Sequence, residues 1–175
     1  MEADPRYPIG KFQRPDSVTS DQRREFIGAI AEAPARLSAA VSGLKPEQLD
    51  TPYRPGGWTV RQVAHHVPDS HMNAFIRIKL ALTEDAPIIK TYEEARWAEL
   101  ADAKAPIEPS LALLDNLHKR WVVLLQSLAP ADWARTFRHP NWKQPMSIDT
   151  ALALYSWHGR HHVAHITALR ERNAW

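Results

Sequence analysis

The chain has 175 residues, 44% of them hydrophobic, so it is long enough to bury a core and is expected to form one domain over residues 1–175. Its formal net charge of only +2 gives no basis for nucleic-acid binding, and the absence of cysteine excludes disulfides, thiolate nucleophiles and cysteine-ligated zinc. No apolar run approaches the roughly 20 residues needed to cross a bilayer, and the N-terminus lacks a signal-peptide core, so we expect a cytoplasmic protein without a membrane partner.

The N-terminal region is predicted to form an extended arm followed by a helix. The first 18 residues are rich in proline and have no helical period, which favours an extended arm over the domain, anchored by Tyr7 and Phe12. The first long helix is predicted to begin at Thr19 or Ser20, where a hydroxyl can cap it, and to end near Ser42.

The second long helix has the clearest start signal in the chain. Thr59 is its expected N-cap, and Gln62 three residues later completes a capping-box pattern. Pro68 inside this helix removes one backbone hydrogen bond and is expected to bend it. The apolar residues that follow Thr59 have the period of an amphipathic helix: Val60, Val63, Ala64, Val67, Ala74, Phe75, Ile78 and Leu82.

A long polar connection over residues 83–107 leads to the third long helix. A short helix is predicted within it at Glu93 to Asp102, and connections of this length are usually lids, binding loops or interface elements. The third helix is predicted over 110–128, with His118 near its inward face in a structural role beside Trp121. Residues 131–147 look irregular apart from one helical turn at 131–135.

The last helix is predicted from Ile148, after a Ser147 cap, to Leu169. Its inward stripe contains three successive imidazoles, His158, His162 and His165. One histidine on an apolar stripe is usually a core residue with a hydrogen-bond partner. Three in succession bury several ring nitrogens, each costing roughly 1–3 kcal/mol if unpaired, so a polar partner or a metal is expected opposite them.

Four long amphipathic helices without strand alternation predict an all-α fold. The architecture expected is a four-helix bundle with an extended N-terminal arm and a long connection between the second and third helices. A functional site is expected between the second and fourth long helices, where the two histidine-rich segments would face each other.

The histidines of these two helices form a candidate metal site. His158 and His162, four residues apart, can bind one ion, and a histidine of the second helix can complete a set of three. The helical periodicity favours His66 for that position, because it lies at the edge of the apolar face, whereas His65 points to a different side.

Two segments carry a family resemblance. GGWTVRQVAHHVPDSHMNAFIRIKLALTED and SWHGRHHVAHI closely resemble the YfiT branch of the DinB-like proteins, described as metal-dependent hydrolases and including bacillithiol S-transferases. The resemblance extends over most of the chain and implies a four-helix bundle, often dimeric, so a homodimer is expected. It also implies that His66, His158 and His162 bind zinc or nickel with positions left open for water. Pro68 departs from the family pattern.

The resemblance and the residues together predict a metal-dependent hydrolase acting on a small molecule. Asp69, one turn beyond His66, is a candidate for orienting a ligand or nucleophile, with solvation on the helix surface as the alternative. His161 and His165 are candidates for proton transfer or for supporting the ligands, with core packing as the alternative. The alternatives are a metal-dependent transferase that uses a low-molecular-weight thiol, a bundle that binds metal or a small molecule without turnover, and a simple dimerisation unit.

Overall fold

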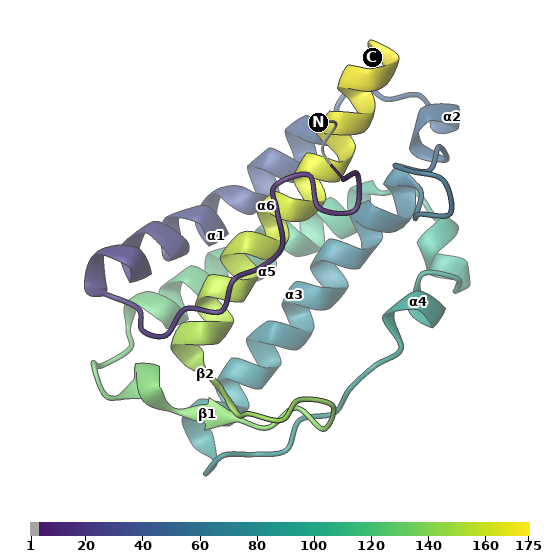
Figure 1. Cartoon of the computed structure of the whole chain (residues 1–175). Coiled ribbons are helices and arrows are strands. Elements are labelled where there is room, and N and C mark those ends of the chain that lie inside the picture. Colours follow the sequence, from purple (N-terminus) through teal and green to yellow (C-terminus); the bar gives the residue numbers. More distant parts are fainter. Residues whose placement is uncertain (1–3) are drawn as a thin grey trace.

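The computed structural model describes residues 4–175, and four long helices pack in it as a bundle (Figure 1). The four helices are α1 (Ser20–Val41), α3 (Val60–Thr83), α5 (Glu108–Gln126) and α6 (Ile148–Asn173). The all-α four-helix bundle expected from the sequence is therefore confirmed. Helices α1 and α3 each pack against both α5 and α6, which places α1 and α3 on one diagonal of the bundle. Helices α3 and α6, the two histidine-rich helices, are consequently neighbours.

Local capping signals explain where the long helices begin. The hydroxyls of Thr19 and Thr59 both close capping boxes, and Ser147 caps α6, as predicted. Helix α5 starts at Glu108, two residues earlier than predicted, because Pro109 is compatible with the first turn of a helix, where its missing N–H costs nothing. Helix α3 continues through Pro68 to its end.

The apolar core is divided into two clusters. One contains Ile78, Trp121 and Leu152, and the other contains Leu37 and Val63. Along α3, α5 and α6 the first cluster lies at one end of the helices and the second at the other. Along α3 and α6, His71, His158 and His162 fall between the residues of the two clusters, so the core has a polar layer there.

The long connection after α3 contains two short helical pieces where one helix was predicted. These are α4 (Glu94–Trp97) and the 3₁₀ helix η1 (Ala101–Lys104). The prediction of one helix over Glu93 to Asp102 was wrong because of a contact with α3. The Ala98 carbonyl accepts a hydrogen bond from Gln62 Nε2 at 2.8 Å, so it is engaged by α3 instead of by the Asp102 N–H.

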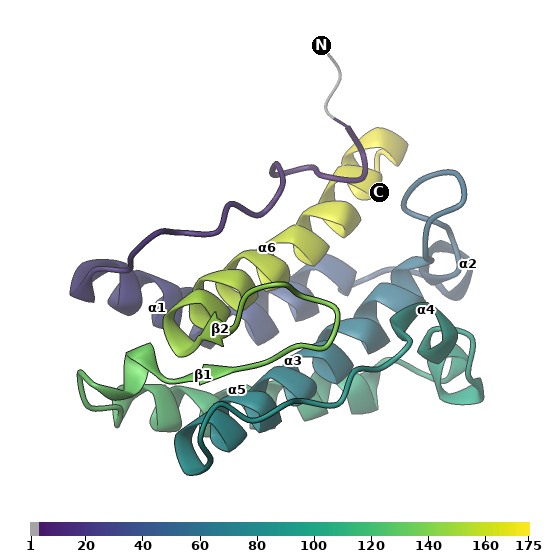
Figure 2. The ribbon, with the colours of Figure 1, turned by 60° about the horizontal axis from the view of Figure 1, so that its bottom comes forward.

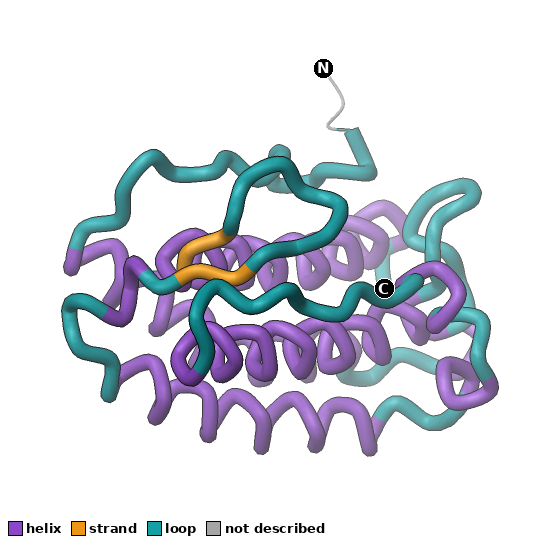
Figure 3. The backbone as a smooth tube through the Cα atoms, turned by 90° about the horizontal axis from the view of Figure 1, so that it is seen from below, coloured by secondary structure: helices purple, strands orange, loops and turns teal. Residues whose placement is uncertain are grey.

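A small hairpin precedes α6, in a segment that was expected to be irregular. The 3₁₀ helix η2 (Asp132–Ala134) leads into β1 (Thr136–Phe137), which pairs antiparallel with β2 (Met146–Ser147). Strands of two residues are too short for side-chain alternation to reveal them. Figure 3 shows the two strands in orange and the long loop between them in teal. Ile89 N–H donates to the Arg138 carbonyl at 3.0 Å, which joins this loop to the connection after α3.

The N-terminal arm lies along α6, as Figures 1 and 2 show. Phe12 packs against Trp157 with ring centroids 5.9 Å apart, and Tyr7 lies near His161 with centroids 6.1 Å apart. The short helix α2 (Pro46–Leu49) links α1 to the loop before α3. Within residues 4–175, no helix has the length and apolar character needed to span a membrane.

Candidate metal centre

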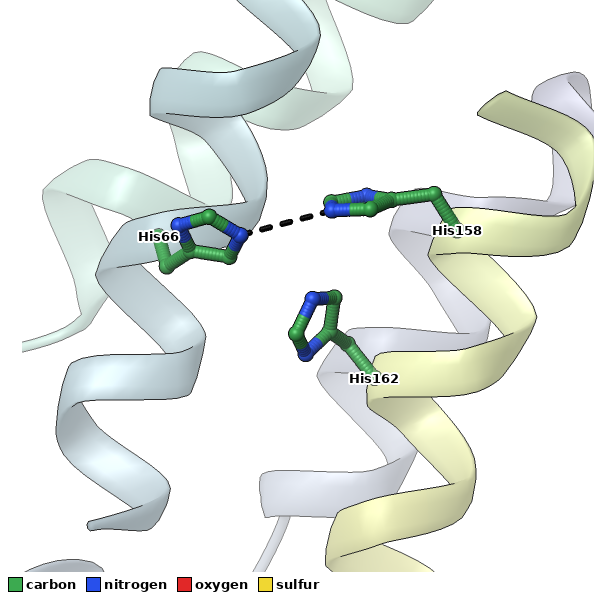
Figure 4. Close-up of side chains that lie close together, drawn as sticks. All are labelled: His66, His158 and His162. Carbon is green, nitrogen blue, oxygen red and sulfur yellow. Dashed lines mark hydrogen bonds between the residues drawn. The ribbon is translucent and has the colours of Figure 1, made fainter. Parts of the chain in front are cut away.

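Three histidines from α3 and α6 converge between the two helices (Figure 4). His66 comes from α3, and His158 and His162 lie one turn apart on α6. Each offers one ring nitrogen, and these three nitrogens lie within 4.8 Å of one another. The Nε2 atoms of His66 and His158 are 3.3 Å apart. The structure thus brings together the three residues that the sequence selected as metal ligands.

The three imidazoles are held in their neutral form. Burial lowers the pKa of His66 to about 4. Burial also lowers the pKa of His158 and of His162 well below the usual histidine value, and the neighbouring imidazoles lower both further. Neutral imidazole is the form that coordinates a divalent metal, so these rings need not lose a proton at pH 7 to bind one.

A chain of hydrogen bonds behind the centre fixes the orientation of His158. His118 Nδ1 lies 2.5 Å from the Ile30 carbonyl, which can only accept, so this nitrogen carries the proton. Neutral His118 therefore accepts at Nε2 from His71 Nδ1, 2.8 Å away. His71 in turn accepts at Nε2 from His158 Nδ1 at 3.0 Å. The lone pair of His158 is thereby assigned to Nε2, the atom that faces His66.

Sequence reasoning missed the role of His71 and His118 in this chain, which we call the imidazole relay. His118 does pack against Trp121, with ring centroids 5.6 Å apart, as expected, but both its ring nitrogens are also hydrogen bonded. Its inward position on the third predicted helix was the available signal. The partner could not be read from periodicity, because His71 and His118 are 47 residues apart.

His65 faces away from the metal centre. Its Nδ1 lies 2.7 Å from Ser110 Oγ and its Nε2 lies 3.1 Å from the Ala105 carbonyl, so both nitrogens face α5 and the segment that precedes it. The structure therefore agrees with the preference for His66 over its sequence neighbour.

Asp69 lies one turn along α3 from His66 and shares a small pocket with it and with His65. The Asp69 side chain is half-buried. Burial raises the pKa of its carboxyl group, and the nearby negative charge of Asp102 raises it further. Asp69 is thus a carboxylate with increased affinity for a proton, placed beside a candidate ligand.

His161 and His165 lie on the other side of the centre, beside a cavity of about 290 Å³ that His162 also lines. His165 Nε2 lies 3.2 Å from the Arg6 carbonyl, to which it donates, and its ring stacks on Tyr53 with centroids 4.0 Å apart. Burial lowers the pKa of His161 to about 4, and His165 adds a smaller lowering. Both have a buried Nδ1 without a hydrogen-bond partner.

The donor set fits a divalent transition metal. Among residues 4–175, neither ring nitrogen of His162 makes a hydrogen bond, and the one that faces His66 and His158 lies within 4.8 Å of a ring nitrogen of each (Figure 4). This nitrogen has no protein partner and is available to a ligand. Imidazole nitrogens suit zinc and nickel, and the absence of a carboxylate among the three does not suit magnesium or calcium. The residues present therefore fit the metals expected from the sequence.

A four-helix bundle with three converging imidazoles between neighbouring helices defines a class of helical proteins able to hold one metal ion. The sequence matches the DinB superfamily over residues 29–166. The chain belongs to this superfamily.

Relatives and solved structures agree with this assignment. A Bacillus mycoides protein named "Putative metal-dependent hydrolase" is 55% identical over 172 residues, covering 98% of this chain and 99% of the relative. A Bacillus cereus protein of the same description is 54% identical with the same coverage. YfiT from Bacillus subtilis, described as a probable metal-dependent hydrolase with an unusual four-helix bundle topology, superimposes with a TM-score of 0.96, at 48% identity and 99% coverage of both chains. The four-helix bundle protein TT2238, at 22% identity and a TM-score of 0.58, covers 83% of this chain and 98% of its own and shares the fold.

Proposed function

We propose that this protein is a metal-dependent hydrolase of small molecules, in which His66, His158 and His162 hold Zn²⁺ or Ni²⁺. The observation that carries the proposal is the convergence of three neutral imidazoles beside open space. His158 lines a pocket of about 360 Å³, and His162 lines the cavity of about 290 Å³ on another side. A structural zinc site is closed by four protein ligands, whereas a catalytic site keeps a position for water or substrate.

The chemistry follows from the charge of the donor set. When bound by three neutral ligands, a divalent ion keeps its full charge, polarises a substrate carbonyl and lowers the pKa of water to near neutrality. The three imidazoles orient the ion, and the imidazole relay keeps the His158 ring from turning.

Proton transfer is assigned to side chains around the ligands. Asp69, whose pKa is raised by burial, accepts a proton from the attacking water on the His66 side. On the opposite side, His161 and His165 carry protons between the cavity and solvent. Both remain neutral at pH 7, because burial lowers their pKa, and both have an unpaired Nδ1 able to accept a proton.

The first test is the metal content of untagged protein purified without chelator. We expect near-stoichiometric zinc or nickel in the wild type and loss of the metal in His66→Ala and in His158→Ala. His65→Ala is the matched control: it removes a neighbouring histidine that bonds Ser110 instead, and it should keep the metal. A wild type that is metal-free and takes up neither added ion would refute the proposal.

The metal-loaded protein should then hydrolyse esters or amides, and the His66→Ala and His158→Ala variants should not. Thiol transfer is the other outcome of the same assay. If an electrophile is consumed only when an external thiol such as cysteine is added, the metal site stands but the reaction is a transferase reaction. A fully loaded protein that is inactive in both assays would indicate a binding protein.

A further inference from the structure

A buried arginine without an acidic partner lies on α3, beyond the metal centre. Arg77 is only 8% exposed. Its guanidinium donates from Nη2 to the Lys90 carbonyl at 3.2 Å, and its Cζ lies 5.9 Å from the centroid of the Tyr92 ring. Its Nε is buried and has no partner. Within residues 4–175, no carboxylate oxygen lies within 4.0 Å of this side chain.

A buried guanidinium with unpaired N–H donors destabilises the folded protein unless a ligand accepts hydrogen bonds from it. Arginine stays protonated in proteins, so burial does not remove its charge. A buried charge is normally paired, and an unpaired one is strongly unfavourable. Arg77 therefore has several unused N–H donors in a place where an anion would be bound tightly.

The pocket beside Arg77 leads to the metal centre. Arg77 and His158 both line the space of about 360 Å³. Tyr92, Trp142 and Tyr155 supply aromatic walls. A molecule in this pocket can therefore reach both the guanidinium and the ligand side of the metal centre while its body packs on aromatic rings.

We propose that Arg77 binds the carboxylate of a substrate that carries an apolar or aromatic body and has its reactive group at the His158 end of the pocket. The planar guanidinium matches a carboxylate in a bidentate geometry. This inference rests on the proposed function, because it places a reacting substrate between Arg77 and the metal.

The charges around the pocket favour a single carboxylate over a more highly charged group. Glu93 and Glu94 line the same pocket and are exposed. His139 also lines it, but burial and the charge of Arg77 lower its pKa, so it adds no positive charge at pH 7. One buried cation facing two rim carboxylates would accept a monoanion and repel a phosphate dianion.

The first experiment measures binding to metal-free protein, so that an anion cannot bind the metal. Benzoate and the isosteric neutral benzamide are titrated and followed by tryptophan fluorescence and by amide NMR shifts. We expect benzoate to bind at least about tenfold more tightly than benzamide in the wild type, the typical contribution of a hydrogen bond to a charged group. Inorganic phosphate should compete poorly with benzoate. Equal binding of benzoate and benzamide, or displacement of benzoate by stoichiometric phosphate, would overturn the proposal.

Two substitutions test whether Arg77 causes the preference for benzoate over benzamide. Arg77→Met keeps an apolar stem of similar length and should remove the preference for benzoate. Arg120→Met makes the same charge change at an exposed arginine outside the pocket and should keep it. Circular dichroism checks folding, and if Arg77→Met does not fold, Arg77→Lys takes its place and should reduce the preference because it lacks the planar fork. Persistence of the full preference in the folded Arg77 variant would contradict the proposal.

A second experiment tests the same residue during turnover. Zinc-loaded protein is assayed with 4-acetoxybenzoate and with its methyl ester, which lacks the charge. We expect a wild-type kcat/KM ratio in favour of the carboxylate that falls about tenfold or more in Arg77→Met. An equal loss on both esters would assign Arg77 to the fold alone. If neither ester is hydrolysed, the proposed function is in question, whereas the benzoate titration still decides the role of Arg77.

Discussion

The histidines of the bundle differ sharply between the two sides of the metal centre. On the inner side, His71 and His118 have every ring nitrogen paired, and the series ends on a backbone carbonyl. On the outer side, His161 and His165 each have an unpaired buried Nδ1 beside a cavity. A fully paired ring has one orientation and one tautomer, whereas an unpaired nitrogen remains free to take a proton or a ligand. The same residue type thus orients a ligand on one side and is available for chemistry on the other.

Among the substitutions that test this difference between the two sides, the one at His71 is expected to have the largest effect on metal binding. His71→Leu removes the acceptor for His158 Nδ1, so the His158 ring loses its fixed tautomer. We expect zinc affinity to fall about 10–100-fold, the usual effect of losing a hydrogen-bond partner of a metal-bound histidine. Competition with a chromogenic chelator measures this affinity.

His71→Gln is the matched control for that substitution. A glutamine amide can donate to His118 Nε2 and accept from His158 Nδ1, so it should restore most of the affinity. Long-range ¹H–¹⁵N NMR of the metal-free wild type should find Nδ1–H tautomers at His71, His118 and His158. An Nε2–H tautomer at His158, or equal zinc affinity in the leucine and glutamine variants, would show that the imidazole relay does not orient the ligand.

On the outer side, His161 should make the stability of the metal-free protein depend on pH. The pKa of His161 is about 4 in the folded state and near 6.5 when unfolded. Between these values the unfolded chain binds more protons, so stability is present above pH 6.5 and is lost as the pH falls towards 4. After allowance for solvent near the cavity, His161 is expected to contribute about 1–2 kcal/mol to the stability lost between pH 7 and pH 5.

Urea unfolding at both pH values measures this loss. His161→Phe, which keeps an aromatic ring in contact with Trp157 and Tyr7 and removes the titrating group, should lose correspondingly less stability over the same range. A variant with the pH dependence of the wild type would mean that other groups cause the acid sensitivity.

The smallest effect is expected from Thr59→Ala, which tests whether a loss of stability can occur without a loss of metal binding. Thr59 Oγ1 accepts from the Gln62 N–H at 3.1 Å at the start of α3. Thr59→Ala should lower the free energy of unfolding by about 1 kcal/mol. Zinc affinity should be unchanged, because His66 is held by packing two turns further along the helix. A drop in affinity comparable to that of His71→Leu would mean that general destabilisation weakens the site, and it would remove the distinction between the two sides.

The sequence by itself determined the four helices and the helix faces on which His66, His158 and His162 lie. Helix starts depend on residues close in sequence, such as Thr59 with Gln62, and helical periodicity places His158 and His162 on one face. These are local relations that hold whatever the helices pack against. The same periodicity selected His66 because it lies at the edge of an apolar face.

Only the tertiary structure decided the partners of those residues. The imidazole relay joins α3, α5 and α6 to a carbonyl of α1, and the Arg77 pocket combines α3, α6, the long connection and the hairpin loop. No local pattern states which side chain of one helix meets which side chain of another. Packing also ended the helix predicted at Glu93 to Asp102, because Gln62 of α3 takes the Ala98 carbonyl. Hydrogen bonds between distant segments depend on the relative placement of the helices, which the assembled core alone fixes.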